Sequence, residues 1–233
     1  MLKKIVITGG DGRFSQILKR DNKKLNILYP NKKELNILDV DSIKRYLKKN
    51  KPQYLIHAAA LSRPMNIHDK QISKSIDLNI IGTSNIVKIC SDFKIKLIYF
   101  STGYVYEGRV GNYKETDPVL PVNNYAWSKL GGECAVAMYK HSLILRITMC
   151  EKPFLHEYAF HDINANFIFH EEVVKIIPKI LDKTGVLNIG GKIQSIYSFA
   201  KKTNKNVKKK SGKKLFPKNV SMNVGKLNKI MKW

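Results

Sequence analysis

Two residues with reactive side chains, Tyr125 and Lys129, stand four positions apart at the start of a helical pattern. In a helix this spacing places both side chains on one face, one turn apart. A neighbouring ammonium favours the phenolate, so the pair predicts a tyrosine whose pKa is lowered toward neutrality and which exchanges a proton. Ser101 and Thr102 end a strand pattern 23 residues upstream of the tyrosine. A hydroxyl there can hydrogen-bond the substrate oxygen that Tyr125 protonates.

A glycine-rich loop follows the first strand pattern, with Gly9, Gly10 and Gly12 ahead of a helical segment. Glycines let the backbone approach a pyrophosphate, and the helix N-terminus offers unpaired N–H groups and a favourable dipole. Ser15 takes the third glycine position, and its small side chain should preserve binding. The loop predicts dinucleotide binding; a tight turn that needs glycine for backbone reasons is the alternative.

The residues after the second strand pattern bear on which dinucleotide binds. An acidic residue that selects an unmodified ribose is expected about 20 residues after the loop. None is present there, and Asn31-Lys32-Lys33 stands in its place. A cation beside the adenosine ribose suits a 2′-phosphate, so Lys32 favours NADP (NADPH), with NAD as the alternative. A solvated pair of lysines is the competing explanation.

The scaffold that positions these residues follows from the hydrophobic pattern. Short β-branched segments alternate with longer helical ones, which is typical of βαβ units and a parallel sheet. The expected strands are residues 4–8, 25–29, 54–58, 96–101 and 142–146. The expected helices are residues 14–20, 41–50, 72–93 and 125–140, the second starting at Asp41-Ser42 and stopping at Lys51-Pro52. We predict an α/β fold with a Rossmann-type doubly wound parallel sheet.

The C-terminal third has a looser pattern. We expect helices at residues 170–181, 196–203 and 224–231, and a short strand at residues 186–189. No repeat or long linker separates this part from the rest. We therefore predict an NAD(P)-binding Rossmann domain over residues 1–150. Residues 151–233 should form a small, lysine-rich substrate-binding cap that packs on the first domain and is not an independent one.

The composition is that of a globular chain, with 43% hydrophobic and 26% charged residues. Apolar runs are shorter than the roughly 18 residues of a spanning helix, and the early first strand leaves no room for a signal peptide. Cys90, Cys134 and Cys150 lack a paired spacing, which indicates free thiols rather than disulfides or a zinc site. We expect a cytoplasmic protein with no metal and no membrane partner.

The net charge of +24 is unusual and by itself suggests a nucleic-acid or other anionic partner. Lysine supplies 36 of the 42 basic residues, and residues 183–233 contain 14 lysines and no acidic residue. Abundant Ile and Asn beside Lys indicate A+T-rich codon usage as the larger cause, while part of the charge can steer a diphosphate substrate. Nucleic-acid binding is a minor alternative, because the sequence shows no aromatic-basic platform or groove-reading motif.

Several motifs occur together in a fixed order: TGGDGRFS from Thr8, ELNILD from Glu34, HAAA from His57, NIIGT from Asn79, STGYVYEG from Ser101, YKETDPVLPVNNYAWSKLGGE from Tyr113 and LRIT from Leu145. Over about residues 1–150 the chain resembles the extended short-chain dehydrogenase/reductases. Within them it is similar to nucleotide-sugar reductases of the dTDP-4-dehydrorhamnose reductase type.

The resemblance implies a catalytic triad of Thr102, Tyr125 and Lys129. It also implies dinucleotide contacts along the pyrophosphate, adenine, ribose and nicotinamide at Gly9, Gly12, Arg13, Phe14, Asn36, Ile37, Ala58, Ala59, Ala60, Asn79, Tyr125 and Lys129. In this set Asn79 supports the active-site helix, and Lys129 binds the ribose hydroxyls next to the nicotinamide. The substrate side is implied at Gly103, Tyr104, Lys152, Phe154 and Ser221.

Two departures from the family bear on the reaction. Gly103 stands where family reductases have Asp, and Asn36 replaces an acidic residue. Nucleotide-sugar dehydratases carry Asp-Glu after the threonine, so Gly103-Tyr104 argues against dehydration.

The resemblance implies NAD(P)H-dependent reduction of a nucleotide-linked 4-keto-6-deoxy sugar, as in deoxysugar biosynthesis. Hydride would go to the keto carbon, with Tyr125 as proton donor and Thr102 orienting the oxygen. The alternatives are a nucleotide-sugar epimerase that holds NAD and a catalytically quiet, dinucleotide-binding regulatory subunit with a protein partner. The C-terminal third is shorter than usual for the family, which keeps the regulatory-subunit alternative open. A homodimer is a further partner alternative that the sequence leaves open.

Overall fold

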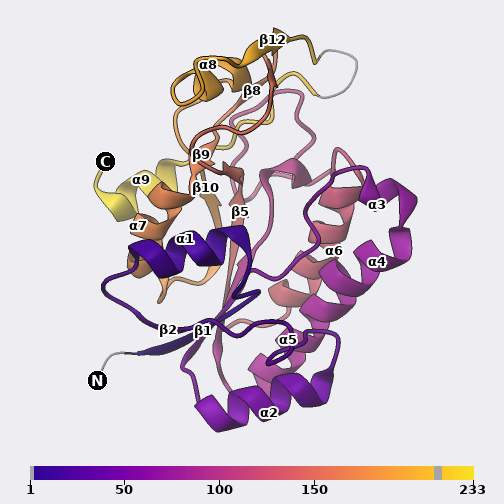
Figure 1. The fold of residues 1–233 in the computed structure, drawn as a ribbon, viewed down its shortest axis with the longest axis vertical. Helices are drawn as coiled ribbons and strands as arrows, with labels where there is room; N and C mark the ends of the chain where they lie inside the picture. The colour runs from indigo at the N-terminus through magenta and orange to yellow at the C-terminus, as the bar shows by residue number, and fades with distance from the viewer. Residues whose placement is uncertain (1–2, 213–216) are drawn as a thin grey trace.

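A parallel sheet lies at the centre of the computed structural model, which describes residues 3–212 and 217–233. Within these residues the sheet has six strands in the order β2-β1-β3-β4-β5-β10 (Figure 1). The strands are β1 (Lys4–Thr8), β2 (Asn26–Leu28), β3 (Tyr54–His57), β4 (Lys96–Phe100), β5 (Ser142–Ile147) and β10 (Gly185–Ile189). The predicted Rossmann-type doubly wound fold is confirmed, and the strands expected before residue 150 end within one residue of their predicted ends.

The strand order creates a switch point between β1 and β3. The chain passes from β1 to β2 on one side, then returns to β3 on the other side of β1, and both neighbours are parallel to it. Loops that leave the carboxyl ends of β1 and β3 therefore diverge, and the crevice between them is where open α/β sheets bind ligands.

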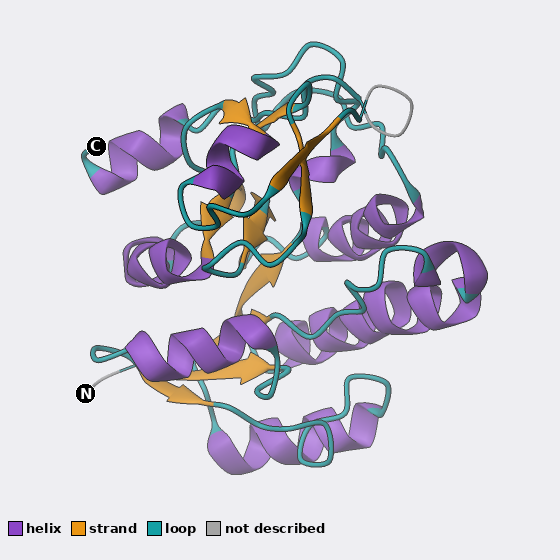
Figure 2. Ribbon diagram, turned by 45° about the horizontal axis from the view of Figure 1, so that its top comes forward, coloured by secondary structure: helices purple, strands orange, loops and turns teal. Residues whose placement is uncertain are grey.

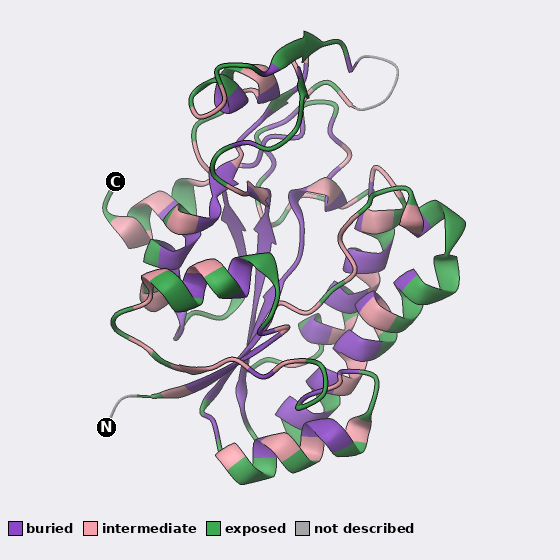
Figure 3. Ribbon diagram, in the orientation of Figure 1, coloured by how far each residue is buried: buried purple, intermediate pink, exposed green. Residues whose placement is uncertain are grey.

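Side chains alternate between the two faces of the sheet, so each face has its own core. Ile5 and Ile7 belong to one core and Val6 to the other. The first face is covered by α1 (Arg13–Asp21), α7 (His170–Ile180) and α9 (Gly225–Met231). The second is covered by α2 (Val40–Asn50), α5 (Gly82–Asp92) and α6 (Asn124–Ala137). Figure 2 shows helices on both sides of the strands, and Figure 3 shows the strands as the buried layer.

The segment predicted as one helix over residues 72–93 has three parts. It consists of α4 (Ile72–Ile76), the π-helix η1 (Asp77–Ile81) and α5, and the unpredicted short α3 (Ile67–Lys70) precedes it. π-Helical turns often occur at functional sites, and this one carries the buried Asn79.

Helix α2 begins earlier than expected. Asp39 is its N-cap and accepts hydrogen bonds from the backbone N–H groups of Asp41 and Ser42, which corrects the start predicted at those two residues. The predicted stop is where expected, with Lys51 at a φ of 46° ahead of Pro52.

The outer lobe consists of short, separate strand pairs. They are β6 (Met149–Cys150) with β9 (Ile168–Phe169), β7 (Tyr158–Phe160) with β12 (Lys208–Lys210), and β8 (Asn164–Ala165) with β11 (Gln194–Ser195). With α8 (Ile196–Lys201) they surround a third core at the top of Figure 1. The part of this lobe outside β6 and β9, which is residues 152–165, 194–212 and 217–221, is called the cap.

Part of the segment predicted as cap, residues 151–233, lies in the central layers instead. Strand β10 pairs with β5, and α7 and α9 pack on the first face of the sheet. The three cysteines are free. Among the described residues, no helix has the length and hydropathy needed to cross a bilayer.

Candidate active site

The three predicted catalytic residues lie at the carboxyl edge of the sheet. Thr102 follows β4 and caps the 3-10 helix η2 (Gly103–Val105), where its hydroxyl accepts a hydrogen bond from the Tyr104 backbone N–H at 3.2 Å. Tyr125 and Lys129 lie one turn apart on α6. The Thr102 hydroxyl lies close enough to the Tyr125 phenol to lower its pKa, which places the two segments side by side. The structure thus brings the hydroxyl, the phenol and α6 together.

Burial raises the pKa of Tyr125 to about 12, against the opposing effects of the Thr102 hydroxyl and the charge of Arg63. This corrects the expectation that Lys129 lowers the pKa of the tyrosine toward neutrality. The Lys129 Nζ atom lies 4.2 Å from the centroid of the Tyr99 ring, and desolvation of the phenol dominates. At neutral pH Tyr125 is therefore protonated, which is the state that a proton donor needs.

Lys129 is a buried ammonium group. Only 3% of the residue is exposed, and burial lowers the pKa of Lys129 to about 7, although the charge of Glu133 opposes the shift. Perturbed pKa values of this kind are typical of functional sites. Near neutral pH the lysine therefore exchanges its proton readily.

Glu133 is a further residue of this site, and we did not predict it. It lies one turn beyond Lys129 on α6, and its carboxylate accepts hydrogen bonds from the Ser101 hydroxyl at 2.6 Å and from Arg146 Nε at 3.0 Å. Because Ser101 precedes Thr102, Glu133 fixes α6 against the ends of β4 and β5. Its spacing of four from Lys129 was the available signal.

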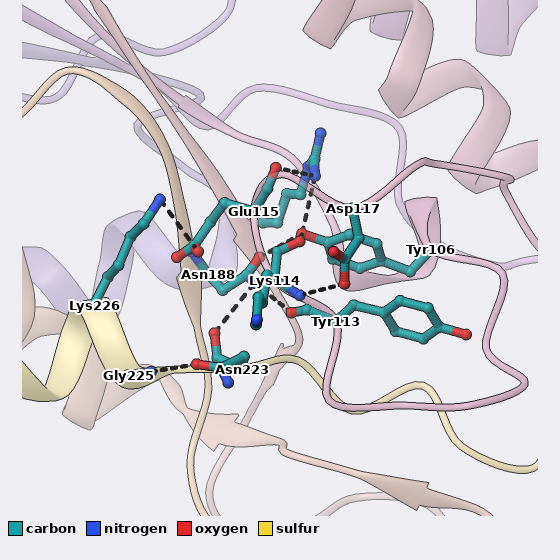
Figure 4. Close-up of polar contacts among 10 residues, drawn as sticks. Tyr106, Tyr113, Lys114, Glu115, Asp117, Asn188, Asn223, Gly225 and Lys226 are labelled. Carbon is teal, nitrogen blue, oxygen red and sulfur yellow. Dashed lines mark hydrogen bonds and ion pairs between the residues drawn. The ribbon is translucent and has the colours of Figure 1, made fainter.

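A second buried network holds the loop between η2 and α6 (Figure 4). The Tyr106 hydroxyl and Asn188 Oδ1 are 2.9 Å apart, and the Asn188 amide donates to the Tyr113 carbonyl at 2.8 Å. Glu115 accepts a hydrogen bond from the Asn188 backbone N–H and pairs with Lys226 at 3.3 Å. Strand β10 and helix α9 thus fix the chain that connects Thr102 to Tyr125.

The glycine loop has the geometry of a pyrophosphate cradle. Gly9 has a φ of 71°, and its carbonyl accepts the Gly12 N–H at 2.8 Å. A Cβ atom on Gly12 would lie 2.9 Å from the Gly9 oxygen, and one on Gly10 would lie 2.4 Å from the Tyr29 oxygen. Gly12 caps α1 without a side chain, so the helix N-terminus remains available to an anion. These residues fit a dinucleotide.

Arg13 and Phe14 begin α1 but differ in what they can offer a ligand. The Arg13 side chain is 51% exposed. Phe14 is buried, with its ring centroid 5.0 Å from that of Phe100 and 5.8 Å from that of His170. Only the backbone of Phe14 can therefore contact a ligand.

A buried chain of hydrogen bonds supports residues 58–60, which were expected to flank the ribose and nicotinamide. His57 lies between the hydroxyls of Thr8, at 2.8 Å, and Thr83, at 3.0 Å. The Thr8 hydroxyl also accepts the Ala59 N–H at 3.1 Å. Burial lowers the pKa of His57 to about 3, so the ring is neutral and supports the loop as a hydrogen-bonding group.

Asn79 connects the loop after β3 to helix α6, which carries Tyr125 and Lys129. Its amide donates to the Leu61 carbonyl at 2.9 Å and to the Ser128 hydroxyl at 2.8 Å, and its oxygen accepts the Leu61 N–H at 2.8 Å. Ser128 stands between Tyr125 and Lys129 on α6. This arrangement suits the supporting role that the family resemblance implied.

The residues expected around adenine and its ribose lie in the loop between β2 and α2. Lys32 is exposed. The Asn36 side chain accepts the Leu38 N–H at 3.2 Å, and the buried Ile37 packs against Gly82. The side chains of Asn36 and Ile37 thus shape the loop, and Lys32 is free to meet an anion from solvent.

The five residues expected on the substrate side differ in their burial and in what their side chains contact. Gly103 and Tyr104 follow Thr102 directly, and Tyr104 packs against the cap core. Phe154 is buried inside that core, while Lys152 is exposed. The Ser221 hydroxyl is buried and bonded to a neighbouring residue of its own loop.

Residues 3–151, more than half of the chain, match the sequence family described as the RmlD substrate binding domain. The chain belongs to this family. Membership confirms the resemblance that the motifs indicated, and the matched range includes the glycine loop, Thr102, Tyr125 and Lys129.

RmlD-like folds recur among solved structures. The dTDP-4-dehydrorhamnose reductase of Bacillus anthracis str. Ames in complex with NADP has a TM-score of 0.87 at 22% identity, covering 98% of this chain and 91% of that chain. The Bordetella bronchiseptica enzyme WbmG in complex with NAD has a TM-score of 0.79 at 18% identity, covering 100% of this chain and 89% of that chain. These similarities establish the shared fold.

Curated relatives fall under two names. Methionine adenosyltransferase 2 subunit beta of Xenopus laevis is 36% identical over 102 residues, 44% of this chain and 30% of that protein. The dTDP-4-dehydrorhamnose reductase of Aggregatibacter actinomycetemcomitans is 28% identical over 150 residues, 62% of this chain and 51% of that protein. The matches thus span about a third to a half of these relatives' length.

Proposed function

We propose that this protein is an NAD(P)H-dependent reductase of a nucleotide-linked 4-keto-6-deoxy sugar. The observation that carries the proposal is Tyr125, a half-buried phenol that its raised pKa keeps protonated, beside Thr102 at the carboxyl edge of the sheet. Lys129 lies one turn away, and the glycine loop fits a dinucleotide. The reductase name of one curated relative supports the same reaction class.

In this reaction the bound dinucleotide would supply the hydride that reduces the keto carbon. Tyr125 donates its proton to the carbonyl oxygen, and Thr102 holds that oxygen and the phenol in line. The carbonyl thereby becomes a hydroxyl, and Tyr125 is left as a phenolate that takes its next proton from solvent. The ammonium form of Lys129 stabilises this phenolate and binds the ribose of the dinucleotide.

Replacement of Tyr125 by Phe tests this role. The variant keeps the ring but lacks the donated proton, so turnover should fall by about 10²- to 10⁴-fold, the usual contribution of a general acid. Tyr158→Phe, on the exposed surface of the cap, is the matched control and should retain activity. Turnover of Tyr125→Phe near the wild-type rate would overturn the assignment.

We further propose that the cofactor is NADPH rather than NADH, because Lys32 is exposed in the loop that would meet the adenosine ribose. Lys32→Ala should lower kcat/KM for NADPH and leave kcat/KM for NADH unchanged. An equal effect on both dinucleotides would contradict a contact with the 2′-phosphate.

A second candidate is a regulatory subunit that binds a dinucleotide and an enzyme partner. The relatives named as subunit beta of methionine adenosyltransferase 2 favour it. The two candidates differ in an observable way. Affinity purification from native cells would yield a stoichiometric enzyme partner for the subunit, and the purified chain would then turn over no nucleotide sugar.

A further inference from the structure

Three charged residues from separate parts of the chain meet beside the dinucleotide crevice. Arg13 is the first residue of α1, Arg63 lies in the loop after β3, and Glu151 follows β6. The Glu151 Oε1 atom lies 3.2 Å from Arg13 Nε and 3.0 Å from Arg63 Nη1. One carboxylate oxygen thus pairs with two guanidinium groups, one at the start of the helix that follows β1 and one in the loop that follows β3, the two strands at the switch point.

The exposure of the three side chains suggests a binding site rather than a simple surface ion pair. The exposed fraction is 51% for Arg13 and 34% for Arg63, but only 17% for Glu151. Burial opposes ionisation of Glu151, but its backbone hydrogen bond and both arginines outweigh this and keep its pKa below the usual value. The carboxylate is therefore charged, while both guanidiniums keep surface facing solvent.

The cluster also reaches the catalytic residues. The charge of Arg63 lowers the pKa values of Tyr104 and Tyr125 against the larger effect of burial, which places its guanidinium near both phenols. The loop that carries Arg63 is fixed two residues earlier, where the Asn79 side chain hydrogen-bonds both backbone groups of Leu61. The same amide that supports α6 thus also fixes the loop that carries Arg63.

We propose that Arg63 joins Arg13, for which the family resemblance already implies a pyrophosphate contact, in an anion subsite for a phosphate group of the nucleotide ligands, and that Glu151 occupies this subsite until a ligand replaces it. The inference rests on the proposed function. Guanidinium groups bind phosphate through paired N–H donors, and a phosphate offers more charge and more acceptor oxygens than the single carboxylate oxygen that they share here. Glu151 thereby acts as an internal competitor that sets nucleotide affinity.

Isothermal titration of the full chain with NADH, NADPH and dTDP tests this subsite and identifies the phosphate. If the substitutions change the affinities for NADH and NADPH equally, the bound group is the pyrophosphate of the cofactor. If they change the affinity for NADPH alone, it is the 2′-phosphate, and if they change the affinity for dTDP alone, it is the diphosphate of the substrate. The variants are Glu151→Gln, Arg63→Gln and Arg63→Lys. The control is Glu157→Gln, because Glu157 pairs with Lys208 on the exposed surface of the cap.

Glu151→Gln should tighten binding of the responding ligand by roughly 3- to 10-fold, because one unit of competing negative charge is removed at contact range in a partly hydrated site. The salt dependence of that binding should also steepen. Arg63→Gln should weaken the same ligand, Arg63→Lys should fall between it and wild type, and Glu157→Gln should match wild type.

The proposal is overturned if Glu151→Gln binds all three ligands no more tightly than wild type, or if Arg63→Gln leaves all three affinities unchanged. Either result leaves the reductase proposal standing, provided that wild type binds a dinucleotide. If wild type binds none of the three ligands, the reductase proposal and the subsite both fail. Thermal unfolding of each variant shows that a change in affinity does not come from loss of fold.

Discussion

Replacing Lys129 by Met should remove most of the reductase activity and at the same time stabilise the protein. The ammonium is buried on α6, and its pKa falls from 10.5 to about 7. At about 1.4 kcal/mol per tenfold change in a proton equilibrium, this corresponds to about 5 kcal/mol of destabilisation by the buried charge. Met has a similar length and no charge, so the variant should recover an appreciable part of that free energy of unfolding.

The gain should depend on pH in a defined direction. Below pH 7 Lys129 is protonated in both the folded and the unfolded chain, so the full cost of burying the charge is present. Between pH 7 and 10.5 the folded state prefers the neutral amine while the unfolded state still binds the proton, so the cost falls as pH rises. It should decrease from about 5 kcal/mol at pH 6 to about 2 kcal/mol at pH 9.

Urea unfolding without nucleotide, followed by circular dichroism at pH 6 and pH 9, measures this effect. Lys88→Met, on the exposed side of α5, is the control and should change stability little at either pH. Lys129→Met should be more stable than wild type at pH 6, with a smaller margin at pH 9. A less stable variant at pH 6, or a margin that does not narrow at pH 9, would refute the reasoning from the buried ammonium.

Three other substitutions probe the supports of the site. Glu133→Gln leaves the Arg146 guanidinium buried without its counter-charge and should cost about 3–5 kcal/mol in urea unfolding; a loss below 1 kcal/mol would show that the pair is dispensable. Gly10→Ala places a methyl group against the Tyr29 carbonyl and should cost about 1–3 kcal/mol while weakening NADPH binding, as calorimetry would reveal. Asn79→Ala should lower kcat/KM by freeing the loop after β3, and unchanged kinetics would remove its positioning role.

The local periodicities were enough to predict the central sheet. Strands such as β1 and β4 are short β-branched or aromatic segments that are buried on both faces, and that pattern does not depend on distant contacts. The predicted N-cap of α2 is two residues late and its first helical residue one residue late, because Asp39 and Asp41 both suit an N-cap and tertiary contacts decide between them. The division of the C-terminal third also depends on long-range pairing, since β10 has the same local pattern whether it joins the sheet or the cap.

The candidate site was predicted only in part, for an equally physical reason. Tyr125, Lys129 and Thr102 carry motif spacing, but the pKa of a buried group depends on desolvation, which spacing does not report. Glu133 is a regular helix position whose role appears only when Ser101 and Arg146 are placed beside it. Arg63 and Glu151 are 88 residues apart in sequence, and only the fold brings them together.

Transfer of label from NADPH to a sugar tests the central claim most directly. The purified chain would be incubated with NADPH deuterated at the transferred position and with dTDP-, UDP- and GDP-linked 4-keto-6-deoxy sugars, and the products analysed by mass spectrometry. The account predicts that deuterium appears on the former carbonyl carbon of at least one sugar with wild-type protein, and that Tyr125→Phe nearly abolishes the transfer. Absence of deuterium from every sugar, with the NADPH left unoxidised, would contradict it.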